Sequence, residues 1–209
     1  METNIASLNL NKTYNYAQYL TWRFQERIEL IKGKIFKMSP APARKHQYVS
    51  GELYIQIGVF LRKKKCKVYS APFDVRFPKG EGDENTFTVV QPDICVICDP
   101  KILDDRGCAG APDLIIEILS PATAKKDVKD KFELYEESGV KEYWIVSPEN
   151  HIVDVFELDN AGKYQLRGKF TKGDKVLVGV LPGLEIILDD VFENDEDENT
   201  NASINEIRL

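Results

Sequence analysis

Two periodicities of apolar residues run along the first part of the chain, and each predicts a different element. Residues 28–38 hold two apolar-rich runs on either side of Lys32-Gly33, which is the pattern of a β-hairpin. Residues 46–61 instead place apolar side chains at three- and four-residue steps, which predicts an amphipathic helix. Short apolar runs at residues 67–70 and 73–77 predict two more strands.

The second half of the chain combines strand patterns with one further helix. Residues 87–98 predict a long strand, interrupted early by a proline that should mark a strand end or a bulge. Residues 112–120 form an almost continuous apolar run, as a central strand of a sheet does. We expect a helix to follow, from about Thr123 to Gly139, because threonine is a good N-cap and glycine a good residue after a helix end. Strand-like runs then recur over residues 141–180 with turn residues between them, which indicates a β-meander.

The order of these elements describes a mixed α/β (α+β) domain, because a helix, three strands, a helix and a strand follow one another. A short helix over residues 14–24 should precede this core. We expect one domain over residues 14–192, a flexible N-terminus over residues 1–13 and a disordered acidic tail over residues 193–209.

The composition is that of an ordinary globular protein, with 43% hydrophobic residues. The first twenty residues lack the basic and apolar regions of a signal peptide, and no apolar run reaches the length of a membrane span. We therefore expect a soluble, cytoplasmic protein without a membrane partner.

The four cysteines fit a reducing compartment, and their spacing argues against a metal site. Cys95 and Cys98 have the CxxC spacing, but residues three apart on a strand point to opposite faces of the sheet. We expect both to be free, buried and hydrophobic in character. Cys66 and Cys108 have no partner at metal-ligand spacing.

The formal net charge of -6 is unevenly distributed. Eight acidic residues without an intervening Lys or Arg lie near the C-terminus, and the remainder of the chain carries a charge of +2; the eight are Glu185, Asp189, Asp190, Glu193, Asp195, Glu196, Asp197 and Glu198. Residues 23–67 hold twelve basic residues against three acids. This segment is either a footprint for a phosphate backbone or simply a solvated face.

Two acidic residues in apolar strands require an explanation. Asp93 begins an apolar strand, and Glu117 lies in the middle of another between isoleucines. A carboxylate in such a place costs several kcal/mol unless it is paired, hydrogen-bonded or bound to metal. On a helical wheel, Lys131 falls within the apolar face of the following helix, between Phe132 and Leu134, and so should point toward the sheet that carries Glu117.

Two carboxylates and a lysine suit either of two arrangements. Mg²⁺ prefers carboxylate oxygens and leaves room for a substrate phosphate, whose charge it neutralises, while the lysine stabilises the transition state or orients the attacking water. A buried ion pair between an acid and Lys131 would fit the same spacing, and the spacing alone does not decide between the two.

At this point the chain resembles a known family. Asp93 in QPDICVI, Glu117 in PDLIIEILSP and the run KFELYEESGVKEYWIVSPEN are similar to the Uma-two family of restriction-endonuclease-like proteins, within the PD-(D/E)XK superfamily; IELIKGKIFKMSPAP and KHQ also fit. The resemblance covers about residues 14–188. It implies an αβββαβ endonuclease core with an N-terminal hairpin, and Mg²⁺-dependent hydrolysis of DNA, with Mn²⁺ able to substitute. It also implies that Asp93 and Glu117 ligate the metal, helped by the carbonyl of Ile118.

One position departs from the superfamily pattern. The lysine expected two residues after the motif glutamate is Leu119 here, so Lys131 would be a migrated replacement. Three other residues are weaker candidates for binding substrate or metal, namely Glu29, His46 and Gln91. Asp113 lies at a strand entrance, where a loop cap is the simpler interpretation.

The leading hypothesis is therefore a Mg²⁺-dependent DNA endonuclease in which Asp93, Glu117 and Lys131 are catalytic. We expect a homodimer if both strands of a duplex are cut. The alternative is a catalytically inactive nucleic-acid- or protein-binding module on the same fold, with the acids and lysine kept as an ion pair. A third hypothesis is an unrelated metal hydrolase that acts on small phosphoesters.

Overall fold

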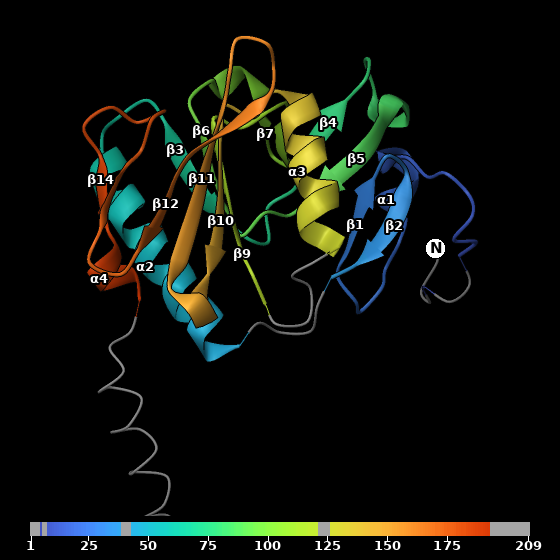
Figure 1. The fold of residues 1–209 in the computed structure, drawn as a ribbon. Helices are drawn as coiled ribbons and strands as arrows, with labels where there is room; N and C mark the ends of the chain where they lie inside the picture. The colour runs from blue at the N-terminus through green and yellow to red at the C-terminus, as the bar shows by residue number, and fades with distance from the viewer. Residues whose placement is uncertain (1–4, 6–7, 39–42, 121–125, 193–209) are drawn as a thin grey trace, which may run out of the picture.

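The computed structural model describes residues 5, 8–38, 43–120 and 126–192, which fold into two six-stranded sheets, four α-helices and a small two-stranded sheet (Figure 1). The first sheet has the strand order β2-β1-β5-β4-β8-β7. Its strands are β1 (Ile28–Ile31), β2 (Lys34–Lys37), β4 (Val75–Pro78), β5 (Thr86–Val90), β7 (Leu103–Asp104) and β8 (Gly107–Ala109). The short helix α1 (Tyr16–Tyr19) contacts β5 of this sheet. It is shorter than the helix expected over residues 14–24.

The second sheet carries the core of the fold and has the order β12-β11-β10-β9-β6-β3. Its strands are β3 (Lys67–Ser70), β6 (Ile94–Ile97), β9 (Leu114–Ile118), β10 (Glu142–Ser147), β11 (Ile152–Leu158) and β12 (Tyr164–Thr171). Together with α2 (Arg44–Leu61) and α3 (Lys126–Ser138), strands β3, β6, β9 and β10 give the order αβββαβ. This order confirms the predicted restriction-endonuclease-like core, and β9 and β10 pair in parallel across α3 as a βαβ unit must.

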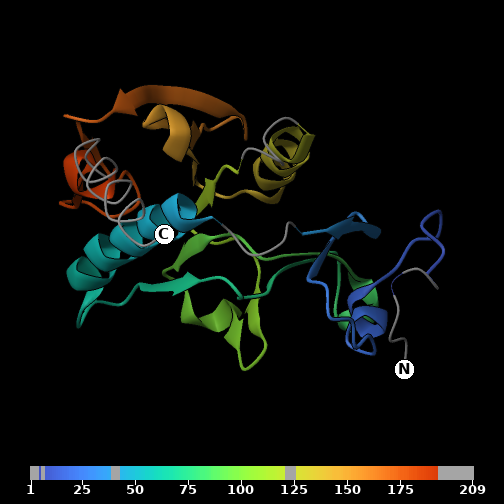
Figure 2. The same cartoon turned by 90° about the horizontal axis from the view of Figure 1, so that it is seen from below.

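The two long helices lie on opposite faces of the second sheet (Figure 2). Helix α2 packs its buried residues Val49, Leu53, Ile57 and Leu61 against the face that carries Ile94, Val96, Leu114 and Ile116. Helix α3 packs Leu134 and Tyr135 against Cys95, Ile97 and Ile115 on the other face, together with residues of the first sheet. Helix α3 therefore lies in the angle between the two sheets, and every alternate residue of β9, Glu117 included, faces it.

The strand end expected at Pro92 is confirmed, but the long strand over residues 87–98 is wrong, because its two parts lie in different sheets. Strand β5 ends at Val90 in the first sheet, and β6 begins at Ile94 in the second. Pro92 has no N–H to donate to a ladder, so the chain leaves one sheet there and enters the other. This crossing places Gln91 and Asp93 at the junction of the two sheets.

The N-terminal hairpin forms as predicted. Lys32 and Gly33 have φ values of 50° and 76°, which are the left-handed values that a tight two-residue hairpin turn requires. A Cβ at position 33 would lie 2.3 Å from Cγ2 of Thr13, so only glycine fits here. The hairpin pairs with β5 through Leu30 and Val89, which brings Glu29 toward the junction of the sheets.

The C-terminal extension agrees with the predicted meander only in part. Strands β10, β11 and β12 follow one another as antiparallel neighbours. The run over residues 175–180 leaves this sheet, and β13 (Lys175–Leu177) pairs with β14 (Glu185–Ile187) before the short helix α4 (Leu188–Val191). Short 3₁₀ turns complete the described elements as η2 (Asp83–Asn85), η3 (Pro100–Ile102) and η4 (Pro148–Asn150).

The two predicted ends of the helix α3 have different outcomes. The predicted end of α3 is confirmed, since Gly139 follows the helix with a φ of 81°. Thr123, the predicted start, lies outside the described residues, as do the proposed tail and most of the N-terminal segment up to residue 7. None of the helices in the described ranges combines the length and apolar character that a membrane crossing needs.

The expectation that Cys98 is a free thiol is wrong, because Cys66 and Cys98 form a disulfide. Strands β3 and β6 pair antiparallel with Lys67 opposite Ile97, so the residues just outside this pair face each other. Spacing along the chain cannot reveal such a partner. Cys95 and Cys108 are free and buried. As expected, the side chains of Cys95 and Cys98 pack on opposite faces of the second sheet.

Candidate functional site

Asp93 and Glu117 come together because β6 and β9 are antiparallel neighbours. Ile94 pairs with Ile116, so the next position outward sets Asp93 beside Glu117. The carboxylate of Asp93 accepts a hydrogen bond of 2.8 Å from the backbone N–H of Ile118. The two acidic residues singled out in the sequence thus occupy one end of the second sheet, at its junction with the first.

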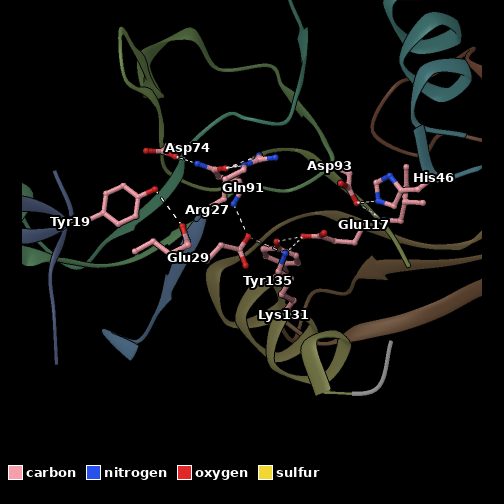
Figure 3. A network of polar contacts seen from close by, with 12 residues as sticks. Tyr19, Arg27, Glu29, His46, Asp74, Gln91, Asp93, Glu117, Lys131 and Tyr135 are labelled. Carbon is pink, nitrogen blue, oxygen red and sulfur yellow. Dashed lines mark hydrogen bonds and ion pairs between the residues drawn. The ribbon is translucent and has the colours of Figure 1, made fainter. Parts of the chain in front are cut away.

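Lys131 reaches this pair from α3, as the helical wheel predicted (Figure 3). Its Nζ atom lies 2.9 Å from Oε1 of Glu117 and 3.1 Å from Oε1 of Glu29. The side chain is only 12% exposed, so both ion pairs are largely shielded from water. Lys131 therefore joins a strand of each sheet through one ammonium group.

Glu29 enters the site from β1 and is 5% exposed. Its Oε1 also accepts the backbone N–H of Gln91 at 2.8 Å. The side chain of Gln91 lies in a network beside the site, where Oε1 accepts from Arg27 at 2.8 Å and Nε2 donates to Asp74 at 2.8 Å (Figure 3). The backbone N–H of Gln91 thus fixes the carboxylate of Glu29, and the side chain of Gln91 links Arg27 to Asp74 at the junction of the two sheets.

Tyr135 is the residue of this site that the sequence pattern did not identify. Its hydroxyl donates to Oε1 of Glu117 at 2.6 Å, from a fully buried ring one helical turn after Lys131. In the sequence, Tyr135 reads as part of the apolar face of α3. The four-residue spacing from Lys131 was the available signal, because residues at i and i+4 lie on one face of a helix.

The charges of the cluster are unbalanced, since three carboxyl groups face one ammonium. Burial, with the negative charges of Asp93 and Glu29, raises the pKa of Glu117 to about 7, against the lowering effect of Lys131. Burial lowers the pKa of Lys131, but the charges of Glu117 and Glu29 outweigh it and hold that pKa above its usual value. The lysine therefore stays charged, and the acidic cluster as a whole favours an added positive charge.

His46 approaches Asp93 from the first turn of α2. Its Nε2 lies 3.4 Å from Oδ2 of Asp93, while its Nδ1 is buried without a hydrogen-bond partner. Burial lowers the pKa of His46. The hydrogen bond and negative charge of Asp93, with the backbone of Ile118, raise it by more, so the pKa of His46 lies above its usual value. His46 thus belongs to the cluster and is not an exposed helix-start residue.

Two neighbouring positions have structural roles. The carboxylate of Asp113 accepts from the N–H of Cys98 at 2.7 Å and from Nζ of Lys141 at 2.6 Å, which agrees with a loop cap. Leu119 packs against the core cluster below α3, and its N–H donates to the carbonyl of Val146. Over the described ranges, no three His, Cys, Asp or Glu side chains are grouped closely enough to hold a metal as they stand.

The αβββαβ core, with an acidic pair and a lysine at the junction of its sheets, defines a restriction-endonuclease-like protein. A family model described as "Putative restriction endonuclease" matches residues 16–189, and the chain belongs to this family, Uma2 (Uma-two).

Two relatives extend this comparison. The chain is 26% identical over 150 residues to an uncharacterized protein of Synechocystis sp. The aligned region covers 70% of this chain and 75% of that protein. It is also similar to a crystal structure from Anabaena variabilis described as a "putative nuclease", with a TM-score of 0.65 and 22% identity over 85% of this chain and 97% of the other. At that identity the second likeness establishes the fold.

Proposed function

We propose that this chain is a metal-dependent endonuclease that hydrolyses DNA phosphodiester bonds, with Mg²⁺ at Asp93 and Glu117 and with Mn²⁺ able to replace it. The observation that carries the proposal is the contact of 2.9 Å between Nζ of Lys131 and Oε1 of Glu117. It supplies from α3 the lysine that is absent at position 119. Family membership supports the reaction class.

The chemistry of the site suits a hard divalent cation. Asp93 and Glu117 would hold the metal with the carbonyl of Ile118, because Mg²⁺ takes one or two carboxylates and keeps the rest of its shell for water and phosphate. The excess of carboxyl groups over ammonium groups also favours an added cation, because Asp93 and Glu29 place negative charge beside Glu117. When bound, such a metal supplies a water of lowered pKa and neutralises charge on the phosphate.

Lys131 acts in this proposal as the fixed positive charge of the active site. An ammonium has three N–H donors, and Glu117 and Glu29 account for two of them. The third can donate to a phosphate oxygen or to the attacking water, where a preorganised charge stabilises the transition state. Glu29 would keep the ammonium in place, which would leave Glu117 available to hold the metal.

The exposed basic residues of the N-terminal hairpin would contact the DNA backbone. Arg27, Lys32 and Lys37 are exposed in and beside the β1–β2 hairpin, the same hairpin that carries Glu29. Gln91 and His46 would position the substrate phosphate at the same junction. A twofold-symmetric homodimer would present two such sites to the two strands of a duplex.

One observation favours a second candidate function, a non-catalytic nucleic-acid- or protein-binding module. Lys131 already forms two shielded ion pairs, and such a cluster can hold the two sheets together without any metal. This candidate predicts that Mg²⁺ and Mn²⁺ leave the melting temperature unchanged. It still allows a salt-dependent affinity for DNA through the basic hairpin.

The test is cleavage of supercoiled and linear DNA with Mg²⁺ or Mn²⁺. We expect wild type to cut and both Glu117→Gln and Lys131→Met to lose activity. Glu133→Gln is the matched control, because Glu133 lies on the exposed face of the same helix. Cleavage that survives both site substitutions contradicts the assignment. Activity on bis(p-nitrophenyl) phosphate but not on polymers would instead favour a small-phosphoester hydrolase.

A further inference from the structure

The outward face of α2 carries more apolar surface than a helix exposed to water needs. Within the described residues eight large hydrophobic side chains are exposed, and four of them lie on this helix, namely Tyr48, Tyr54, Ile55 and Val59. Ile55 and Val59 are one turn apart and are 53% and 59% exposed. Single exposed apolar residues are ordinary, whereas a group of them on one face marks an interaction surface.

Gly51 lies on the same face, one turn before Ile55, and the rest of the chain gives no reason for a glycine there. It lies inside an 18-residue helix, where glycine is less favourable than alanine. A Cβ at position 51 would meet no atom of the described residues within 4 Å, whereas a Cβ at Gly58 would contact Val68 at 3.8 Å. Close approach by a partner is a reason for glycine at such a position.

Strands β13 and β14 extend this face beyond the helix (Figure 1). The side chain of Gln56 accepts from the N–H of Ile187 at 2.9 Å and donates to the carbonyl of Ile187 at 3.2 Å, which fixes β14 beside α2. Ile187 and Leu177 on the paired strands are both exposed. A stable interface takes roughly 800 Å² from each partner, so a face that spans a helix and the neighbouring strands suits one better than a single helix does.

This face is complementary to a second copy of itself. In an antiparallel pair of α2 helices related by a twofold axis at Ile55, positions equally far before and after Ile55 meet. Gly51 lies four residues before it and Val59 four residues after it. The exposed Val59 of each copy would therefore lie over the missing side chain at Gly51 of the other. A twofold interface needs a projection and a recess on the same surface, and this face has both.

Two charges beside the apolar centre favour the antiparallel orientation. Glu52 is half-buried and Arg62 is exposed, and neither has an ion-pair partner among the residues that the structure describes. They lie on opposite sides of Ile55, so the antiparallel pair brings unlike charges to the same end of the contact. Helical side chains lean toward the helix N-terminus, which directs Glu52 of one copy toward Arg62 of the other. A parallel pair would instead place Glu52 beside Glu52.

We propose that α2 is a dimer interface, on which a second copy of this chain packs antiparallel over Gly51, Ile55 and Val59. Burial of the two apolar side chains favours association, and the missing side chain at Gly51 allows the close approach. The proposal goes beyond the proposed function, which invokes two copies for cutting a duplex but does not place their contact. It depends on neither metal nor cleavage, so the two proposals can fail separately.

Sedimentation of the full-length protein from ~1 to ~100 µM measures the monomer–dimer equilibrium. We expect a dimer in wild type, and Ile55→Gln and Gly51→Gln should each raise its Kd at least ~10-fold. Both variants should fold, because position 55 is exposed and a side chain at position 51 meets open space, and circular dichroism verifies this. Leu166→Gln is the matched control, since Leu166 is 54% exposed on β12 and should leave the Kd unchanged.

Cysteine cross-linking tests the register of the contact. Ile55→Cys should form an intermolecular disulfide with copper–phenanthroline, because the twofold axis places this position against itself, within the ~7 Å between Cα atoms that a disulfide allows. Gly51→Cys mixed with Val59→Cys should cross-link more than either variant alone. Leu166→Cys should not cross-link. The two free thiols of the wild-type chain are buried and so do not interfere.

Three outcomes would overturn the interface. The first is a full-length protein that stays monomeric over the whole concentration range, which would leave this face to a different occupant. The second is a dimer that is indifferent to both Ile55→Gln and Gly51→Gln, and the third is cross-linking through position 166 but not through position 55. A dimer of this register without metal-dependent cleavage would contradict the proposed function alone, and cleavage by a monomer would contradict the interface alone.

Discussion

The Nζ atom of Lys131 lies 2.9 Å from Oε1 of Glu117, although the lysine belongs to a helix and the glutamate to the strand that precedes it. The usual motif places both residues on one strand, and Leu119 fills the expected lysine position here. Leu119 instead completes the apolar packing below α3. The helix delivers the positive charge because Lys131 lies within its inward face, beside Leu134 and Tyr135.

This arrangement predicts that the lysine can be moved back to the strand. Lys131→Leu should lower the rate of DNA cleavage by about 10²–10³-fold, the usual effect of removing one preorganised charge in an active site. Leu119→Lys in the Lys131→Leu background should recover part of this loss, because position 119 directly follows β9 and the alternation of the strand points it to the same side as position 117. Single-turnover cleavage of a plasmid measures both effects. Lys129→Leu, on the exposed side of α3, is the control and should leave the rate unchanged.

Tyr135 should stabilise the site through its charged acceptor. Tyr135→Phe removes the 2.6 Å hydrogen bond to Glu117 and should lower the free energy of unfolding by about 1.5–3 kcal/mol. Tyr164→Phe is a matched control, since that buried hydroxyl donates at 2.9 Å to the neutral carbonyl of Val140 and should cost only about 1 kcal/mol. Urea unfolding above pH 7, where Glu117 is ionised, compares the two. Equal losses would argue that the charge of Glu117 does not strengthen its hydrogen bond.

The two tyrosines should also differ in their effect on function. Tyr135→Phe should weaken Mn²⁺ binding because it frees the carboxylate of Glu117 from one of its two anchors. Tyr164→Phe should leave the Kd for Mn²⁺ unaltered. A Kd that moves equally in both variants would mean that general destabilisation, and not the positioning of Glu117, is responsible.

Glu142 should make stability depend on pH at a distance from the site. Its carboxyl group is fully buried and accepts from Nε1 of Trp144 at 2.7 Å and from the N–H of Val180 at 2.9 Å. Burial raises its pKa above the usual value, against the lowering effect of these hydrogen bonds and of Arg167. Between the two pKa values the folded protein holds a proton that the unfolded chain has released, so the free energy of unfolding falls as pH rises.

Replacing Glu142 by glutamine tests this sign directly. Glu142→Gln removes the titrating group, so its free energy of unfolding should fall less than that of wild type as pH rises above the usual pKa of a glutamate. Denaturant unfolding from pH 4 to 8 measures the difference between the two proteins. A difference that is constant across this range would show that Glu142 does not titrate with a raised pKa.

The features predicted from the sequence are those that local patterns encode. The hairpin, α2, β9 and α3 follow from apolar periodicity, and the inward angle of Lys131 is a property of one helix alone. The division of residues 87–98 between two sheets and the disulfide between Cys66 and Cys98 depend on which strands become neighbours. Periodicity along the chain does not determine such pairing.

The site was predicted in part for the same reason. Asp93 and Glu117 stand out because each is polar in an apolar strand. Glu29 comes from the other sheet, and only the meeting of the two sheets places it beside Lys131. Tyr135 counts as a core residue in any hydrophobic pattern that treats tyrosine as apolar. The hydrogen bond from its hydroxyl to Glu117 is therefore found only in the structure.

A crystal soaked in Mn²⁺ shows whether Asp93 and Glu117 hold one divalent cation beside Lys131. We expect one anomalous peak at roughly 2.1 Å from a carboxylate oxygen of each acid. Glu117 should then have turned toward the ion while Glu29 still holds the ammonium of Lys131. The absence of a peak at saturating Mn²⁺, with Lys131 still bridging Glu29 and Glu117, would rule out this metal site and identify the cluster as a set of ion pairs that joins the two sheets.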